Sequence, residues 1–235
     1  MNNKKLITGL IFAGLFPSIM TLLYFVVLAG EGSNLQKITY TIGKVLQFTF
    51  PLWFLVWVMK TKIRPPLKWT KSIWVGLLFG ITVGFLMMGM IHSSLFSETL
   101  LQTLKLNIQT KLETLNITSL WSYVGLGIFY SLIHSFLEEY YWRWFVYGQL
   151  KTLMGKMGAN ILSSLCFMSH HVIVLAVFFG WTNPFTYILS FMIALGGSFW
   201  AWHYERTQSL IGPWLSHMIE DAAIFYIGYQ LVQLS

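Results

Sequence analysis

Several ionisable side chains stand inside segments that are otherwise apolar. Of the 235 residues, 56% are hydrophobic and only 10% are charged. Nine ionisable residues nevertheless fall deep within long apolar stretches: Glu138, Glu139, Glu220, Asp221, His134, His170, His171, His217 and Arg143. Lys44 also falls in such a stretch, near its edge. Such a group at the centre of a bilayer costs about 2.5–3.5 kcal/mol on insertion scales. We therefore expect these groups to meet inside a helical bundle or to line a watery cavity.

The spacing of these residues separates candidate catalytic groups from candidate supports. Glu139 and Arg143 are four residues apart, so they share a helix face and are predicted to pair. Glu138 is rotated from Glu139 by about 100° and is available for another role. His217 and Asp221 also stand four apart on one face. Glu138, His217 and Asp221 are therefore candidate catalytic residues, and Glu139 with Arg143 is predicted to be structural support.

Three further histidines are candidates for the same site as Glu138. His170 and His171 are consecutive and point in different directions, so we expect only one of them, His171, to face the site. His134 precedes Glu138 by one turn and is predicted to hydrogen-bond to it or to a backbone carbonyl. With a rise of about 1.5 Å per residue, Glu138, His171 and His217 fall in one zone between the cytoplasmic half and the midplane.

These residue types fit peptide hydrolysis, which needs an activated water and a group that holds the developing negative charge. A buried Glu has a raised pKa and acts first as base and then as acid. A neighbouring His shares or relays the proton. Alternatively, Glu138, His171 and His217 make a His₂Glu set for zinc, with water as the fourth ligand. Both the metal-free and the zinc mechanism stay open, and we expect either no cofactor or Zn²⁺.

The elements that carry these residues are predicted to be membrane-spanning helices. A spanning helix needs roughly 20 apolar residues. We predict an all-α, polytopic transmembrane bundle of about seven spans, and six to eight fit the pattern. The spans are 6–29, 42–59, 72–93, 119–147, 157–179, 185–202 and 209–232. We expect one membrane domain, in which N-terminal helices and a loop helix fill residues 1–118 and the candidate catalytic core fills residues 119–235.

The basic residues predict the orientation of these spans. With seven spans, ten basic residues fall on one side, and only Lys37, Lys105 and Lys111 fall on the other. Positive charge collects on the cytoplasmic side of a membrane. We therefore expect a cytoplasmic N-terminus in an integral, multi-pass protein. The net charge of +7 is then a topology signal, and no nucleic-acid partner is expected.

Two more features follow from the sequence. The loop 94–118 spaces Leu and Ile as a helix does, which predicts a helix along the membrane interface or packed on the bundle. The composition excludes a soluble enzyme, a disordered chain and a fibrous protein. A single cysteine, Cys166, excludes a disulfide-stapled secreted domain.

Three motifs in order resemble those of the CPBP family of intramembrane proteases. Glu138-Glu139-Tyr140-Tyr141-Trp142-Arg143 fits E-E-x-x-x-R, Phe167-Met168-Ser169-His170-His171 fits F-x-x-x-H, and His217-Met218-Ile219-Glu220-Asp221 fits H-x-x-x-N/D. That family includes the type II CAAX prenyl endopeptidases and bacterial bacteriocin-processing and self-immunity proteins such as those that resemble lysostaphin resistance protein A. The resemblance covers about residues 119–232.

The resemblance implies a role for each motif residue. Glu138 resembles the residue that activates water, and His171 resembles its partner. His217 and Asp221 resemble the group that stabilises the oxyanion or binds a metal. The prenyl endopeptidases usually have Asn where Asp221 stands, and an ionised Asp cannot donate to an oxyanion. Asp221 would have to be protonated, orient His217, or bind metal.

Together these observations predict an intramembrane endopeptidase. Its expected partners are the lipid bilayer and a membrane-associated or lipidated protein or peptide, for which a prenylated CAAX protein is the example that the resemblance offers. Two other functions compete with this one. A proton-coupled transporter also uses buried Glu and His relays, and a catalytically inactive interaction or immunity protein would keep the polar core for stability.

Overall fold

A computed structural model describes residues 3–29, 33–61, 63 and 66–233. These residues form helices joined by short connections, and no strand occurs among them. The predicted all-α, polytopic fold class is confirmed. The chain divides into two compact units, Met1–Leu67 with Glu138–Leu210 and Lys68–Leu137 with Ile211–Ser235. The division into N-terminal helices over residues 1–118 and a catalytic core over residues 119–235, which follows the sequence motifs, stays a prediction.

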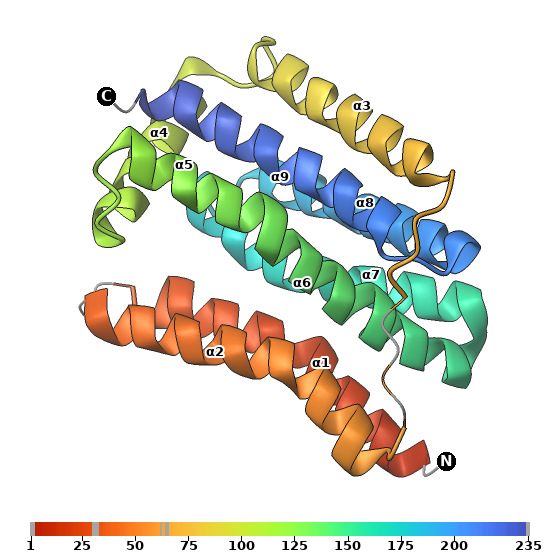
Figure 1. The fold of residues 1–235 in the computed structure, drawn as a ribbon. Coiled ribbons are helices and arrows are strands. Elements are labelled where there is room, and N and C mark those ends of the chain that lie inside the picture. The colour runs from red at the N-terminus through yellow and green to blue at the C-terminus, as the bar shows by residue number, and fades with distance from the viewer. Residues whose placement is uncertain (1–2, 30–32, 62, 64–65, 234–235) are drawn as a thin grey trace. The chain divides into compact units, whose positions relative to one another are not determined.

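The first unit contains two N-terminal helices and two long helices from the second half of the chain. Its elements are α1 (Asn3–Leu22), η1 (Leu23–Val27), α2 (Ser33–Trp53), η2 (Phe54–Val58), η4 (Tyr140–Tyr147), α7 (Gly148–Phe179) and α8 (Pro184–Thr207). Figure 1 shows α1 and α2 as a red and orange pair. Within this unit α7 packs on α1 and on α8. The Ser18 and Ser169 hydroxyls lie 2.6 Å apart, and the Tyr141 hydroxyl donates to the Ala13 carbonyl at 2.7 Å. These polar contacts join α1 to the elements that carry the candidate site.

The core of the first unit is mainly aromatic. Its largest buried side chains include Tyr141, Trp142, Phe145, Tyr147 and Phe167. Four of these five belong to η4, directly after Glu138 and Glu139. In a membrane, where lipid tails are as apolar as leucine, close packing and interhelical hydrogen bonds hold helices together. The run of aromatic residues after the two glutamates therefore anchors this stretch firmly in its unit.

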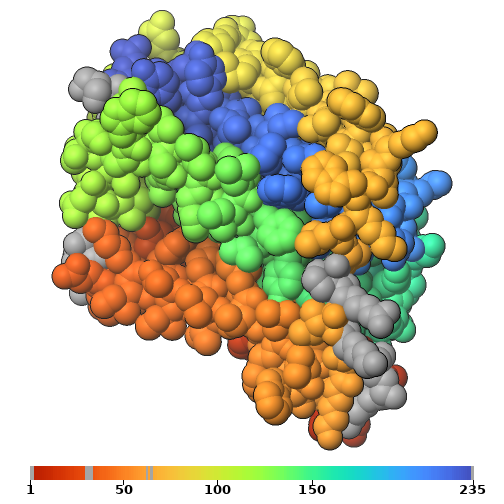
Figure 2. Space-filling model, viewed as in Figure 1, coloured from red at the N-terminus to blue at the C-terminus, as the bar shows by residue number. Residues whose placement is uncertain are grey.

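The second unit is built around a close contact between α3 (Ile73–Ile91) and α9 (Ile211–Val232). Figure 2 shows their surfaces, gold to yellow and blue, pressed together. Gly76, Gly80 and Gly84 face α9, and a Cβ at Gly80 would lie 2.7 Å from the Ser216 carbonyl oxygen. Small residues at every fourth position let two membrane helices approach this closely. This stripe, which sequence reasoning did not single out, places α9 and hence His217.

The other elements of the second unit are shorter. They are α4 (Glu98–Thr114), α5 (Leu120–Ile128) and η3 (Phe129–His134), and the five-residue α6 (Ser135–Glu139) leads from this unit into the first. The Ser97 hydroxyl caps α4 by accepting from the Leu100 N–H at 3.2 Å. The predicted helix in the loop 94–118 is therefore present, and its place at the membrane interface stays a prediction.

Five helical segments of the described chain are long and apolar enough to cross a membrane. They are Asn3–Val27, Asn34–Val58, Ile73–Ile91, Leu120–Phe179 and Pro184–Thr207. The 60-residue segment holds two predicted spans, because Gly155 breaks it with φ 73° and ψ 178°. Only glycine adopts this conformation readily. The predicted seventh span is α9, which has the required length but carries His217, Glu220 and Asp221 and is not among the five.

One predicted boundary is wrong by nine residues. The second span was expected over 42–59, with Lys44 close to an edge, but α2 begins at Ser33 and continues through η2 to Val58. The expectation started the span after Lys37, although a helix tolerates a lysine at its end because the long side chain reaches water. Lys44 therefore lies near the middle of this span. Lys62 and Arg64, two of the ten basic residues on the predicted cytoplasmic side, lie outside the described residues.

Candidate active site

The chain around Glu138 is wound irregularly. The short α6 stands between two π-helical stretches, η3 and η4. Wider π-helical turns are uncommon and frequently occur at functional sites. Both Glu138 and Glu139 are almost fully buried, at 2% and 0% exposure. Two adjacent buried carboxyl groups need different partners, and the structure gives each its own.

Glu139 pairs with Arg143. Its Oε1 lies 3.2 Å from Nη1 of the arginine, so the pairing predicted from the four-residue spacing is present. The Arg143 guanidinium also lies over the rings of Phe167 and Trp200, 4.5 and 4.8 Å from their centroids. A Cβ at Gly197 would come within 3.1 Å of Arg143 Nη2. The arginine thus links η4, α7 and α8, which fits structural support.

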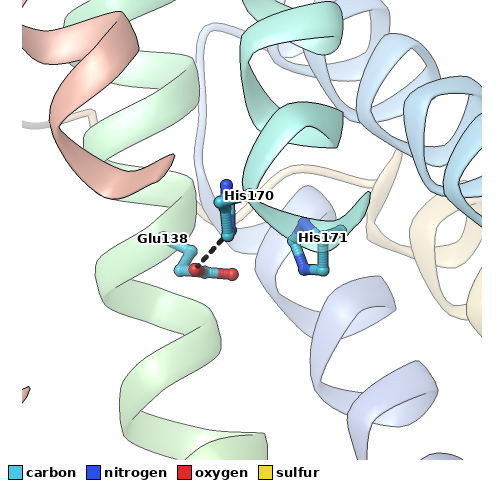
Figure 3. Close-up of side chains that lie close together, drawn as sticks. All are labelled: Glu138, His170 and His171. Atoms are coloured by element: carbon cyan, nitrogen blue, oxygen red, sulfur yellow. Dashed lines mark ion pairs between the residues drawn. The ribbon is translucent and has the colours of Figure 1, made fainter. Parts of the chain in front are cut away.

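Glu138 faces the histidines of α7. Figure 3 shows its carboxylate and the His170 ring pointing toward one another, with Oε1 and Nε2 3.7 Å apart. His170 is 5% exposed, and its ring is parallel to that of Trp142, with centroids 5.8 Å apart. This placement differs from the expectation that His170 points away from the site. A shift of about 100° between neighbours is too coarse to exclude an imidazole that reaches a nearby glutamate.

His171 lies beside the same carboxylate. Its Nδ1 is 2.9 Å from the Phe167 carbonyl oxygen. A carbonyl only accepts, so this contact assigns the hydrogen to Nδ1 and leaves the lone pair on Nε2. Glu138, His170 and His171 each offer a ligand atom within 4.8 Å of the other two. The structure therefore brings Glu138 and His171 together, and it adds His170 to them.

Two imidazoles and a carboxylate are a donor set that zinc uses in catalytic sites. Ligand atoms on a tetrahedral zinc lie about 3.4 Å apart, given bonds of about 2.0–2.1 Å. The 3.7 Å between Glu138 and His170 is close to this value, and the 4.8 Å limit for the whole set needs a small inward shift of the side chains. The chemistry of the three residues fits zinc, with His170 in the place that sequence analysis gave to His217.

The third motif lies in the second unit, on α9. His217 is 5% exposed, and its Nε2 lies 3.7 Å from Asp221 Oδ1, as the four-residue spacing predicts. The neighbouring Glu220 accepts a hydrogen bond from the Ser216 hydroxyl at 3.0 Å. The Trp214 indole N–H donates to the Leu132 carbonyl at 2.9 Å. These contacts hold the His217–Asp221 pair in a fixed part of α9.

His134 belongs to the second unit and to η3. It is buried, and its ring lies against that of Tyr130, with centroids 4.8 Å apart and planes tilted by 46°. Its predicted hydrogen bond to Glu138 or to a backbone carbonyl stays a prediction.

Comparison with protein families matches the region that carries the three motifs. Residues 118–223 match the family model described as type II CAAX prenyl endopeptidase Rce1-like. The resemblance expected from the motifs is thereby confirmed. The matched range includes Glu138, His170, His171, His217 and Asp221. Comparisons with curated proteins and with solved structures give no match.

Proposed function

We propose that this integral membrane protein is an endopeptidase that hydrolyses a peptide bond of a membrane-associated protein or peptide. The observation that carries the proposal is the buried cluster of Glu138, His170 and His171 inside the region that matches the CAAX endopeptidase family. A carboxylate beside two imidazoles, held on helices of membrane-spanning length, supplies a base, a proton partner and shelter from bulk water. A prenylated CAAX-type protein is the substrate class that we propose from the family match.

In this proposal Glu138 removes a proton from a water molecule that lies between it and His171. The lone pair on His171 Nε2 accepts the second hydrogen of that water and orients it. The hydroxide attacks the peptide carbonyl, and the protonated Glu138 then gives its proton to the leaving amine. The water thus supplies OH to the acyl product and H to the amine.

The negative charge that develops on the carbonyl oxygen needs a donor. From the motif, we assign this role to His217. An ionised Asp221, 3.7 Å from His217, stabilises the protonated imidazole and keeps it a donor. This accounts for an Asp where the prenyl endopeptidases usually have Asn.

Zinc is the alternative means of activating the water. The residues that would hold it are Glu138, His170 and His171, and a bound zinc would lower the pKa of its water. The protein's own groups would then orient substrate and move protons as described above.

A cleavage assay tests the proposed function. Purified protein in detergent is given a quenched-fluorophore farnesylated CAAX peptide, with and without a chelator. Glu138→Gln should lower cleavage by at least 100-fold, a typical effect of losing a general base. Glu113→Gln, at an exposed position in α4, is the matched control and should cleave like the wild type.

The outcomes separate the candidate functions. Cleavage that depends on Glu138 supports the protease, and its loss with chelator supports zinc. A chain that folds but cleaves neither this peptide nor any membrane protein in cells contradicts the proposal. Substrate flux in vesicles without cleavage would indicate a transporter instead.

We also propose that the N-terminus lies in the cytoplasm and that the site opens to that side, because the basic residues gather there. A single cysteine introduced near Lys4, in a Cys166→Ser background, should react with an impermeant reagent only from the cytoplasmic face.

A further inference from the structure

A lysine stands near the centre of the second span. Lys44 lies in α2, within the 25-residue candidate span Asn34–Val58. Its ammonium lies 5.8 Å from the centroid of the Tyr40 ring and 5.4 Å from that of Phe48. Within the described part of the chain it makes no ion pair or hydrogen bond. A cation in this position is costly and typically marks a functional site.

A second polar group faces the same place. Gln47 follows Lys44 by three residues, so both lie on one face of α2. Gln47 is 2% exposed, and its amide Nε2 has no hydrogen-bond partner among the described residues. A buried donor without an acceptor costs about 1–3 kcal/mol. The Lys44 ammonium and the Gln47 amide are therefore two hydrogen-bond donors, one of them charged, that can bind an acceptor.

Lys44 and Gln47 line one small cavity between α1–η1 and α2. We call it the Lys44 niche, and its wall also includes Thr21, Tyr24 and Tyr40. Its volume is about 20 Å³, and one water needs about 10–15 Å³ on this measure. The niche therefore has room for one or two water-sized groups, such as the oxygens of one carboxylate, beside the ammonium and the amide. A phosphate, with four oxygens around its centre, is too large for it.

The depth of the niche separates a peptide from a lipid as the source of this carboxylate. Lys44 is about 11 residues from the start of α2 and about 14 from the end of η2, which is roughly 16 and 21 Å along the helix. Lipid headgroups lie outside a hydrocarbon core about 30 Å thick. A carboxylate reaches this depth when a peptide carries it into the protein.

The niche also lies close to the elements that carry the catalytic cluster of its own unit. The Phe48 ring, over which the Lys44 ammonium lies, contacts the ring of Tyr141 in η4, three residues after Glu138, with centroids 6.3 Å apart. A bound carboxylate would be neutralised by Lys44. We propose that Lys44 and Gln47 bind a carboxylate of the peptide substrate and thereby position the chain relative to Glu138. This specificity site rests on the proposed endopeptidase function.

Equilibrium binding tests the niche. The probe is a fluorescein-labelled farnesylated CAAX peptide in three forms: a free C-terminal carboxylate, a C-terminal amide, and an amide that carries a glutamate side chain near its end. Fluorescence anisotropy gives the Kd of each form for the wild type, Lys44→Met, Gln47→Leu and the control Lys37→Met. Lys37 lies on the same helix near its start.

The wild type should bind a carboxylate form about 10- to 100-fold more tightly than the plain amide, the range for hydrogen bonds to charged groups. Lys44→Met should abolish this preference, Gln47→Leu should reduce it severalfold, and Lys37→Met should keep it. The plain amide should bind all four proteins alike, which controls for folding. The form that shows the preference tells whether the terminal or a side-chain carboxylate occupies the niche.

Different results would contradict the carboxylate site in the Lys44 niche and the endopeptidase function. Equal binding of acid and amide forms by the wild type, or no binding of any form, overturns the niche, as does a preference that survives in Lys44→Met. Cleavage measured in parallel decides the protease. A wild type with the carboxylate preference but no cleavage would retain the niche and contradict the endopeptidase.

Discussion

The buried pair of Glu139 and Arg143 gives the sharpest prediction of stability. The side chains are 0% and 2% exposed, and their charged atoms are 3.2 Å apart. Arg143→Met keeps much of the side-chain volume but leaves Glu139 as a buried carboxylate without its cation. Removing one partner of a buried pair costs about 3–5 kcal/mol. We expect the free energy of unfolding to fall by about this amount.

The double variant Glu139→Gln/Arg143→Met tests the cause of that loss. Replacing both charges of a buried pair is often neutral or stabilising, but the contacts of the guanidinium with Phe167 and Trp200 are also lost. Each such contact is worth about 0.5–2 kcal/mol. The double variant should therefore recover a large part of the stability lost in Arg143→Met, without reaching the wild type.

Equilibrium unfolding in mixed micelles, followed by tryptophan fluorescence and circular dichroism, measures these differences. Arg206→Met is the control, because Arg206 is exposed and lies 5.7 Å from the Trp202 centroid. It should cost about 1 kcal/mol or less. The reasoning is refuted if Arg143→Met is as mild as Arg206→Met. It is also refuted if the double variant is no more stable than Arg143→Met.

Three further predictions concern other parts of the chain. His170→Gln should lower kcat for peptide cleavage by at least 10-fold, since His170 Nε2 faces Glu138 at 3.7 Å, while exposed His92→Gln should leave it unchanged. Gly155→Ala should lower the free energy of unfolding by about 1–3 kcal/mol, because φ 73° with ψ 178° disfavours any Cβ, and a denaturation midpoint unchanged from the wild type would contradict this. Burial lowers the pKa of Lys111, in α4, to about 8 from 10.5, so unfolded chains bind more protons between these values, and the free energy of unfolding should rise with pH across that window. Lys111→Met should remove this rise, as unfolding measured at pH 8 and pH 10 would reveal.

The fold class and the positions of the helices could be predicted because a segment that lies in a membrane must be composed mainly of apolar residues. Runs of about 20 apolar residues must be helical, since no water is present to satisfy their backbone groups. The pairs four residues apart, Glu139–Arg143 and His217–Asp221, could be predicted for the same kind of local reason. Such contacts depend only on the pitch of one helix.

Contacts between helices were less accessible to sequence reasoning. The close approach of α3 and α9 depends on Gly76, Gly80 and Gly84. A spacing of four small residues is visible in the sequence, but it does not name the partner helix. Likewise, the extension of α2 back to Ser33 places Lys44 near mid-span, and treating a terminal lysine as a stop concealed this.

The histidine pair shows where a helical projection of the sequence fails. His170 and His171 differ by about 100° around α7, which led to the expectation that only one would face the site. Their ring centroids are nevertheless only 4.1 Å apart, because the His170 ring is stacked on Trp142 and the His171 ring is tied to the Phe167 carbonyl. Glu138 approaches from a chain whose winding changes from π to α and back to π within 19 residues, 129–147. A projection with 3.6 residues per turn cannot follow that change. The direction of each side chain at the site is therefore set by the neighbours that hold it, and variants of Trp142 and Phe167 should alter the alignment of the histidines with Glu138 even though neither residue takes part in the proposed chemistry.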